Sequence, residues 1–342
     1  MKRRVFTWIL ITSMLLTGCA DRIQPSGQKQ YTATFLELFD TVTTVVGKAD
    51  SEEAFLEKAR MVRDSLEEYH KLFDGYNSYE GINNLKTIND NAGIQSVTVD
   101  DRIMELLLDC KVYYEMTNGR VNVAMGSVLQ LWHEERTAGI SDPLNAKLPP
   151  LEKLESAAEH RNMENVILDE VNHTVYLADP DMRLDVGAVA KGWTVQKVSE
   201  AAPEGLLISV GGNVVASGPK DSDGTPWVIG IENPDGGAYL HTVYLSKGSV
   251  VTSGDYQRTY VVEGKAYHHI IDPDTLYPAT YWRSVSVVCE DSGLADALST
   301  ALFTLPLEAG QELAARCGAE AVWIDAQFHI YYSPGFSELI RT

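Results

Sequence analysis

The sequence predicts an α+β protein, in which helices flank mixed, mainly antiparallel sheets. Several stretches repeat apolar side chains at spacings of three and four, as amphipathic helices do. Between them lie many short apolar runs, and the later runs are joined by glycine-bearing turns that are typical of antiparallel hairpins. Composition does not shift within residues 34–342, so we expect one domain there, in one lobe or two.

The first half of the chain predicts alternating strands and helices. A strand over 34–46 precedes a helix over 50–72, which Asp50 would cap together with Glu53. Residues 73–89 are rich in Asn, Gly and Tyr and predict a loop without a helix, either a binding loop or a plain connection. The elements expected next are a helix over 100–117 that stops at Asn118-Gly119, a helix through Trp132 and His133, a loop over 137–150, a short helix over 151–160, and a hairpin of strands 166–168 and 174–177.

Residues 183–193, R-L-D-V-G-A-V-A-K-G-W, predict a strand-to-helix turn, with a helix that runs to about residue 202. Small residues let a backbone approach a ligand closely, and a helix N-terminus offers free N–H groups to an anion. Taken alone, such a turn is more often structural. The elements expected after it are a strand over 206–210, successive strands over 227–271, a strand over 285–289, helices over 292–305 and 308–317, and two strands around Asp325-Ala326.

The N-terminus predicts a lipoprotein signal peptide over residues 1–18. Basic residues at positions 2–4 precede an apolar run over 5–16 that is short for a transmembrane helix. Leu16-Thr17-Gly18-Cys19 resembles a bacterial lipobox, which implies cleavage before Cys19 and a lipid on its sulfur. Residues 19–33 would then be the lipidated Cys19 and a polar tether. An ordinary signal peptide with an incidental cysteine is the alternative.

Composition excludes several classes of site. The chain has 342 residues and a net charge of −20 without a basic stripe, which disfavours nucleic-acid binding. It lacks GxxxxGK[ST] and G-x-G-x-x-G, the P-loop and Rossmann signatures. Cys110, Cys289 and Cys317 are far apart and odd in number, which indicates neither a disulfide framework nor a zinc site. A protein this acidic that binds an anionic ligand needs a local cation or metal.

Two later segments carry side chains suited to chemistry. On a helix, Asp296 and Thr300 share a face, where they are either solvated or two hard oxygen ligands for Mg²⁺. His268 and His269 are adjacent, and on a strand they would point to opposite faces, so at most one reaches a given site. That histidine is either structural or an acid/base or phosphate contact.

Six motifs in one order resemble the ApbE family of FAD:protein FMN transferases, many of which are bacterial lipoproteins. They are D-V-G-A-V-A-K-G (185–192), I-S-V-G-G-N (208–213), E-N-P (232–234), V-T-S-G-D-Y (251–256), H-H-I-I-D-P (268–273) and A-D-A-L-S-T-A (295–301). The resemblance covers residues 34–340. It implies Mg²⁺-dependent transfer of FMN from FAD to a threonine or serine hydroxyl of an extracytoplasmic target protein, with release of AMP, by an enzyme lipid-anchored to the bacterial cell membrane. The alternatives are an FAD pyrophosphatase that yields FMN and AMP, and a flavin-binding lipoprotein without catalysis.

The resemblance also implies roles for single residues. The metal ligands would be the carbonyl of Ala188 and the side chains of Asp296 and Thr300, and His269 matches a histidine implicated in transfer. The FAD contacts would be Phe39, Tyr79, Arg120, Val121, Asn122, Asp185, Lys191 and Ile271. This chain departs from the family pattern in three places: Phe39-Asp40-Thr41 replaces Met-Gly-Thr, Asn122 stands where Asp is usual, and Leu276 replaces the glycine of D-P-x-T-G.

Overall fold

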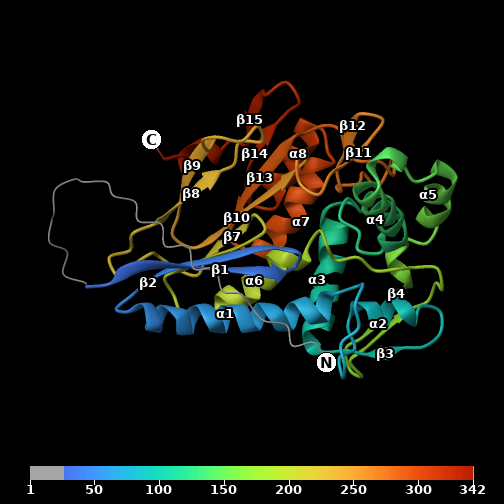
Figure 1. Ribbon diagram of the computed structural model, residues 1–342, viewed down its shortest axis with the longest axis horizontal. Helices are drawn as coiled ribbons and strands as arrows, with labels where there is room; N and C mark the ends of the chain where they lie inside the picture. Colours follow the sequence, from blue (N-terminus) through green and yellow to red (C-terminus); the bar gives the residue numbers. More distant parts are fainter. Residues whose placement is uncertain (1–26, 342) are drawn as a thin grey trace.

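The structure, a computed structural model, describes residues 27–341 (Figure 1). The predicted signal peptide, Cys19 and the first part of the tether lie outside the described residues. No described helix is long and apolar enough to cross a membrane.

An eight-stranded sheet organises the molecule, and each neighbouring pair of its strands is antiparallel. The parallel component that the sequence led us to expect is confined, in the described chain, to an isolated bridge between Met125 and Arg183. In spatial order the strands are β1 (Lys29–Leu38), β2 (Thr41–Ala49), β6 (Leu206–Val210), β7 (Asn213–Ala216), β10 (Gly248–Gly254), β13 (Ser284–Cys289), β14 (Glu320–Ile324) and β15 (Ile330–Tyr332).

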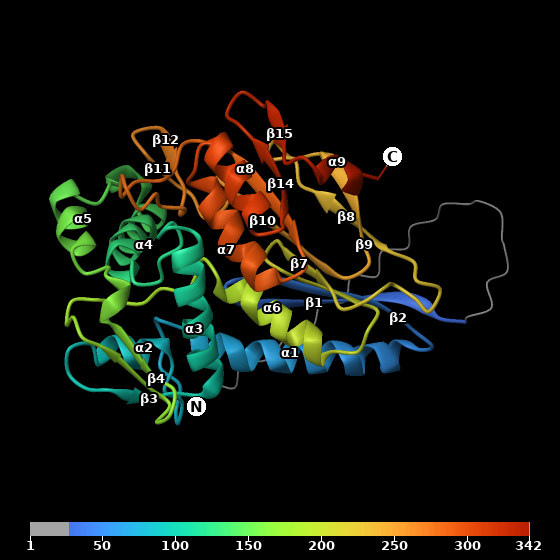
Figure 2. The same ribbon diagram turned by 180° about the vertical axis from the view of Figure 1, so that it is seen from behind.

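Alternating side chains of the sheet build a core on each face. On β14, Trp323 packs with the helices, whereas Val322 faces the opposite way. Figures 1 and 2 show the helices along one face, with the longest of them, α1, beneath β1 and β2. These helices are α1 (Glu52–Phe73), α6 (Ala190–Ala201), α7 (Ser292–Phe303) and α8 (Leu307–Arg316). The other face is covered by β8 (Trp227–Ile231), β9 (His241–Leu245) and α9 (Phe336–Leu339).

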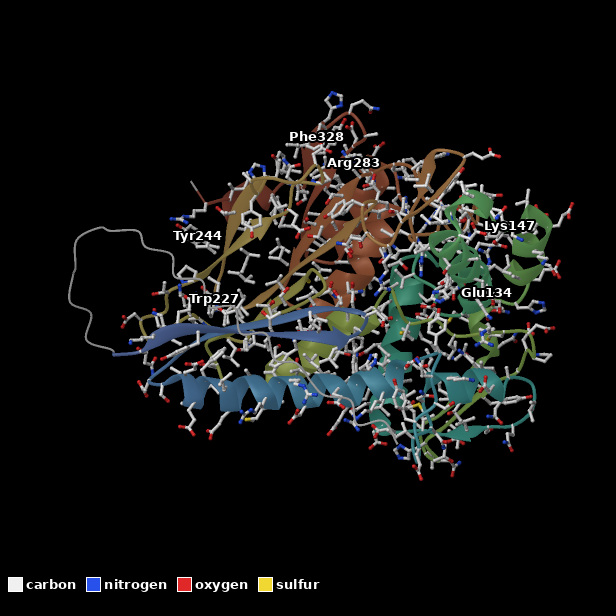
Figure 3. The ribbon with its side chains drawn as sticks, viewed as in Figure 1. Glu134, Lys147, Trp227, Tyr244, Arg283 and Phe328 are labelled. Atoms are coloured by element: carbon white, nitrogen blue, oxygen red, sulfur yellow. The ribbon has the colours of Figure 1, made fainter. Side chains whose placement is uncertain are left out.

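A second group of elements lies beside the sheet and gives the molecule its two-lobed outline. Figure 3 shows Glu134 and Lys147 in this group, at the opposite end of the molecule from Trp227 and Tyr244 on β8 and β9. Its members are α2 (Leu85–Asp90), β3 (Val97–Thr98), α3 (Asp101–Met116), α4 (Gly126–Ser141), α5 (Leu151–Ala158), β4 (Val166–Asp169), β5 (Thr174–Leu177), β11 (Tyr260–Val262), β12 (Lys265–Tyr267) and the 3-10 turns Pro143–Asn145 and Met163–Asn165.

The first predicted strand is in fact a hairpin. β1 begins at Lys29, inside the predicted tether, and the chain reverses at Phe39 and Asp40, both with φ of 52°. Two-residue turns of this kind favour Asn-Gly or Asp-Gly, so Phe-Asp gave no turn signal. The predicted start of the next helix was also wrong in detail, because Ser51 caps α1 by accepting the N–H of Ala54.

The structure differs from the predictions in several other places. Helix α2 lies inside the predicted loop 73–89, where Asn84 and Thr87 form a capping box. Helix α4 continues to Ser141 through a segment predicted as a loop, and β7 and α9 were not predicted. No described strand contains His268–Ile271; of these residues, Ile271 forms an isolated bridge with Pro278. Likewise, the only described strand pairing just before α6 is the single bridge of Arg183.

Candidate active site

Helices α6 and α7 cross at a glycine, and this crossing places Asp296. A Cβ on Gly192 would overlap the carbonyl oxygen of Ser292 and the Cβ of Asp296, so only glycine permits this approach. The Gly192 N–H donates to Asp296 Oδ2 at 2.8 Å, and Lys191 Nζ lies 3.8 Å from the same oxygen. Asp296 is only 4% exposed, which rules out a solvated helix face. Burial raises the pKa of Asp296 despite Lys191 and the Gly192 N–H, so this carboxylate gains from a further cation.

Replacing Gly192 with alanine is expected to destabilise the protein by about 1–3 kcal/mol, because α6 and α7 must separate to admit the methyl group. Chemical denaturation measures this loss. Gly75→Ala is the matched control, since a Cβ at Gly75 meets nothing closer than Leu85 Cδ2 at 3.7 Å. Equal stability of the two variants would contradict the tight crossing.

The same crossing leaves oxygen atoms without partners. Gly192 is in the first turn of α6, where an N–H has no acceptor within the helix. Its N–H donates to Asp296 instead, and the carbonyl of Ala188, just before the helix, accepts from no described group. The hydroxyl of Thr300, one turn along α7 from Asp296, likewise has no hydrogen bond within the described chain. A carboxylate, a carbonyl and a hydroxyl form a hard oxygen donor set, which fits Mg²⁺.

The turn before α6 is held by its own side chains. Asp185 Oδ1 accepts the N–H of Gly187 at 2.8 Å, and the Asp185 N–H donates to Val123. Lys191 Nζ donates to the Gly187 carbonyl at 3.3 Å. Asp185, Ala188 and Lys191 therefore lie on one turn, as the motif predicts, and Lys191 links it to Asp296.

The two adjacent histidines have different environments. His268 accepts the N–H of Ile270 at Nδ1 and donates from Nε2 to the Ala279 carbonyl at 2.9 Å, so both of its nitrogens are used. His269 Nδ1 donates to the Gln257 carbonyl at 3.2 Å, and its Nε2 has no partner among the described residues. Burial and the cations Arg258 and Lys191 lower the pKa of His269 to about 3. His269 is therefore neutral at pH 7, with Nε2 able to accept a proton.

Because the pKa of His269 falls from 6.5 to about 3 on folding, the unfolded chain binds more protons between these values. We expect the His269 contribution to reduce stability as pH falls through that range, and His269→Gln to lose less stability between pH 7 and pH 5 than wild type. Denaturation at both pH values measures this. His160 is the control of opposite sign: Asp179 raises its pKa, so its contribution is lost as pH rises. A His269→Gln protein with the wild-type pH dependence would contradict the assignment.

The predicted flavin contacts near the N-terminus lie on neighbouring loops. The Phe39 carbonyl accepts a hydrogen bond from Arg258 at 3.1 Å, and its N–H donates to His70. Tyr79 donates its hydroxyl to Asp74 at 2.8 Å. Phe39 thus directly contacts a cation beside His269, whereas the hydrogen bond of Tyr79 stays within its own loop.

The other predicted flavin contacts surround the loop after His269. Arg120 pairs with Asp272 at 3.2 Å and with Asp274 at 2.6 Å, and Asn122 donates to the Arg161 carbonyl. Val121 and Ile271 are buried and can shape the site only through packing. The residues Arg120, Asn122, Arg161, Pro273 and Asp274 line a pocket of about 420 Å³.

Leu276, which replaces the usual glycine, has φ of 61°. Glycine adopts this conformation without strain, whereas leucine does not. The residue is 7% exposed, and Trp132 Nε1 donates to its carbonyl at 2.9 Å. Burial and this hydrogen bond therefore hold the loop in a shape that the sequence alone does not favour.

Four residues beside the site were not identified from the sequence: Tyr76, His133, Arg136 and Arg258. The rings of Tyr76 and His133 stack at 4.7 Å, and Arg136 donates to His133 Nδ1 at 3.0 Å. Arg136 and Arg258 add to the burial that lowers the pKa of His269, and burial followed by Asp185 raises the pKa of Tyr76 to about 12. No motif marks them, because α4, the Tyr-rich loop and the loop after β10 meet only in the folded chain.

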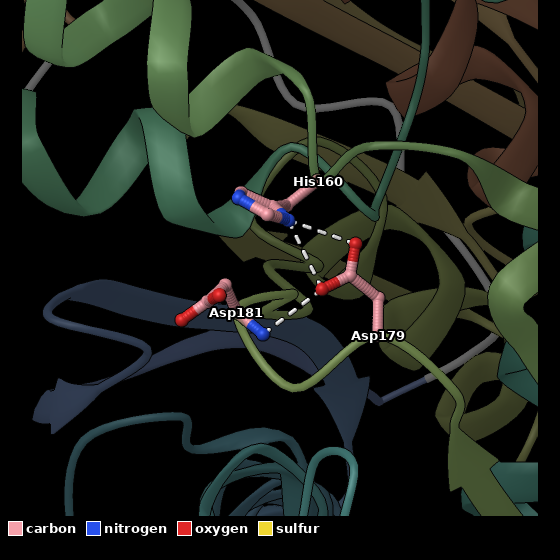
Figure 4. A group of neighbouring side chains, drawn as sticks. All are labelled: His160, Asp179 and Asp181. Carbon is pink, nitrogen blue, oxygen red and sulfur yellow. Dashed lines mark hydrogen bonds and ion pairs between the residues drawn. The ribbon is translucent and has the colours of Figure 1, made fainter.

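A separate cluster of His160, Asp179 and Asp181 has metal-ligand side chains (Figure 4). Asp179 contacts His160 Nδ1 through both carboxylate oxygens, at 3.0 and 2.8 Å, and also accepts the N–H of Asp181. The cluster is thus explained as an ion pair that fixes the end of α5 to the segment before Arg183.

Comparisons with known proteins match almost the whole described chain. The model of the ApbE family matches residues 39–323. The FAD:protein FMN transferase of Treponema pallidum (strain Nichols) is 33% identical over 277 residues, 75% of this chain and 75% of that protein. That of Klebsiella pneumoniae (strain 342) is 33% identical over 230 residues, 65% of this chain and 68% of that protein. The crystal structure of the ApbE protein from Thermotoga maritima superposes with a TM-score of 0.79 at 28% identity, covering 92% of this chain and 100% of the other. The predicted fold class is confirmed.

Proposed function

Because the chain belongs to the ApbE family, we propose that it is an FAD:protein FMN transferase that uses Mg²⁺. It is an enzyme of the transferase class. The acceptor is a threonine or serine hydroxyl of an extracytoplasmic redox protein, and the second product is AMP. The observation that carries the proposal is the α6–α7 crossing, which brings the Asp185–Gly192 motif against Asp296 over 104 residues of sequence.

In the reaction, the acceptor oxygen forms a bond to the FMN phosphorus of FAD, and the bond from that phosphorus to the bridging oxygen breaks. AMP leaves with the bridging oxygen, and the acceptor loses its proton. Mg²⁺ would be held by Asp296, Thr300 and the Ala188 carbonyl, and it supplies charge neutralisation for the phosphates. Lys191 adds a cation beside Asp296.

We assign the proton of the acceptor hydroxyl to His269 Nε2. The Gln257 carbonyl fixes the tautomer, because it accepts from Nδ1 and leaves Nε2 as the acceptor. The low pKa keeps the ring neutral but also makes it a weak base. His269 Nε2 can therefore accept a hydrogen bond from the acceptor hydroxyl at the start of the reaction. It becomes a stronger base once the bound phosphates offset the charge of the nearby cations.

We propose in addition that residue Cys19 carries the lipid and that the enzyme is anchored to the bacterial cell membrane, facing away from the cytoplasm. The lipobox-like sequence before Cys19 supports this. The FAD pyrophosphatase remains the second candidate, because water could take the place of the acceptor hydroxyl without any change in the metal site.

The test incubates the protein with FAD, MgCl₂ and a candidate acceptor domain, and follows in-gel flavin fluorescence together with AMP release. We expect equal amounts of AMP and labelled acceptor, and neither product when EDTA replaces MgCl₂. AMP without labelled acceptor would favour the pyrophosphatase, and FAD binding without either product would favour a flavin-binding protein. An acceptor with its threonine or serine changed to alanine controls for non-specific labelling.

A further inference from the structure

Arg136 and Arg258 belong to segments that pack against each other: Gly139, one turn after Arg136 on α4, lies against the ring of Tyr260, two residues after Arg258. Burial and then the charge of Arg258 lower the pKa of Arg136, and both arginines add to the burial that lowers the pKa of His269. Within residues 27–341, Arg136 is the one arginine whose pKa is held below its ordinary value, whereas that of Arg102 and that of Arg283 are raised by carboxylate partners. Asp185 acts in the opposite direction on Arg136, but the pKa of Arg136 still stays below its ordinary value.

Neither arginine forms an ion pair with a described carboxylate. Arg136 donates to His133 Nδ1 at 3.0 Å, and Arg258 donates to the Phe39 carbonyl at 3.1 Å. Both of these acceptors are neutral. A guanidinium has five donors in a planar fork, and a single hydrogen bond leaves most of them available. In a chain with a net charge of −20, two such arginines on neighbouring segments indicate a site for an anion.

The two arginines are held in place from separate parts of the fold. Arg136 is on α4, where its partner His133 stacks on Tyr76 at 4.7 Å. Arg258 follows β10, has φ of 48°, and reaches the β1–β2 turn, where Phe39 and Asp40 also have positive φ. Backbone strain of this kind costs free energy and persists where the surrounding structure holds it, often at binding sites. Arg258 is next to Gln257, whose carbonyl orients His269.

We propose that Arg136 and Arg258 bind the phosphate oxygens of the flavin dinucleotide beside His269. This inference rests on the proposed function, because it takes FAD as the ligand. In this proposal the two arginines help Mg²⁺ and Lys191 to neutralise the negative charge of the FAD phosphates. It also gives the β1–β2 turn a role, since the Phe39 carbonyl holds the Arg258 guanidinium at the site.

The experiment compares the affinity of wild type, Arg136→Gln and Arg258→Gln for FAD and for riboflavin, which has no phosphate, by flavin fluorescence. We expect each substitution to weaken FAD binding about tenfold or more, because a charge-assisted hydrogen bond is lost, and riboflavin binding to change less than twofold. Arg258→Lys should recover part of the affinity, since it keeps the charge but not the fork. An equal loss for both ligands, or an unchanged FAD affinity, would overturn the inference.

A second measurement uses FAD alone and does not depend on riboflavin binding. The dissociation constant of FAD should rise with NaCl concentration less steeply in Arg136→Gln and Arg258→Gln than in wild type, because each loses one screened charge contact. Identical salt dependence would also overturn the inference. Arg316→Gln is the matched control, since Arg316 is a surface arginine that donates to one carbonyl, that of Met116, and it should behave as wild type.

These results remain separate from a failure of the proposed function. A wild-type protein that binds FAD but labels no acceptor would contradict the transferase and leave the affinity comparison intact. Thermal denaturation of each variant establishes that it is folded before binding is measured.

Discussion

Replacing Asp296 with asparagine is expected to lower FMN transfer by about 10³-fold or more, since the proposed metal ligand and its charge are lost. The side chain keeps its shape, and its remaining oxygen can still accept the Gly192 N–H. In the wild type this N–H donates to Asp296 Oδ2 at 2.8 Å. Without metal, the variant should be at least as stable as wild type, because a buried charge has been removed. Transfer assays and denaturation in EDTA measure the two effects.

Mg²⁺ gives a readout that does not involve activity. A ligand that binds only the folded state at 100 times its dissociation constant stabilises it by about 2.7 kcal/mol. Wild type should therefore melt at a higher temperature in MgCl₂ than in EDTA, and Asp296→Asn should not. Asp291→Asn is the matched control: it removes a carboxylate from the cap of the same helix, at its exposed end, and should retain the Mg²⁺ effect. A variant at Asp296 with full transfer would contradict the metal assignment.

His269→Ala is expected to lower the rate constant of transfer by about 10²–10⁴-fold, the usual range for the loss of an acid/base group. Binding of FAD should change much less, because the imidazole is neutral and its Nδ1 bonds only to the Gln257 carbonyl. Single-turnover transfer measures the rate, and flavin fluorescence measures the binding.

The neighbouring histidine provides the comparison. His268 uses both nitrogens within the fold and packs edge-on against Phe303, at 5.6 Å between ring centroids. We expect His268→Ala to lose stability while retaining most of the rate of its folded fraction. If the two substitutions slowed transfer equally, His269 would have no special role in proton transfer.

Local sequence patterns predicted most of the fold. The apolar stripe of α1 and the glycine-bearing turns of the later strands act over a few residues, so a pattern in the sequence is enough to find them. Helix α2 was not predicted, because its six residues are too few to show a periodicity and its cap, Asn84, is a residue type that is common in loops. The hairpin at Phe39 and Asp40 was not predicted, because surrounding contacts impose the positive φ of these two non-glycine residues.

The site shows the same difference between features that follow from local sequence and features that depend on tertiary packing. Asp185 and Lys191 could be found because they stand in one short motif with its glycines. Burial of Asp296 could not be foreseen, because its helix faces α6 on one side and the sheet on the other, and a sequence period does not show which neighbours an element has. Arg136 and Arg258 are 122 residues apart (258 − 136 = 122), and only tertiary packing brings them together.

The hydrogen bond from the Gly192 N–H to Asp296 has a consequence for the dynamics of the protein. The amide proton of Gly192 is protected from exchange with solvent only while α6 and α7 stay in contact, because its acceptor is on the other helix. The N–H of Trp193 donates to the carbonyl of Val189, the N-cap of α6, so its protection does not require contact with α7. Hydrogen exchange at these two neighbouring amides therefore separates fraying of α6 from parting of the two helices.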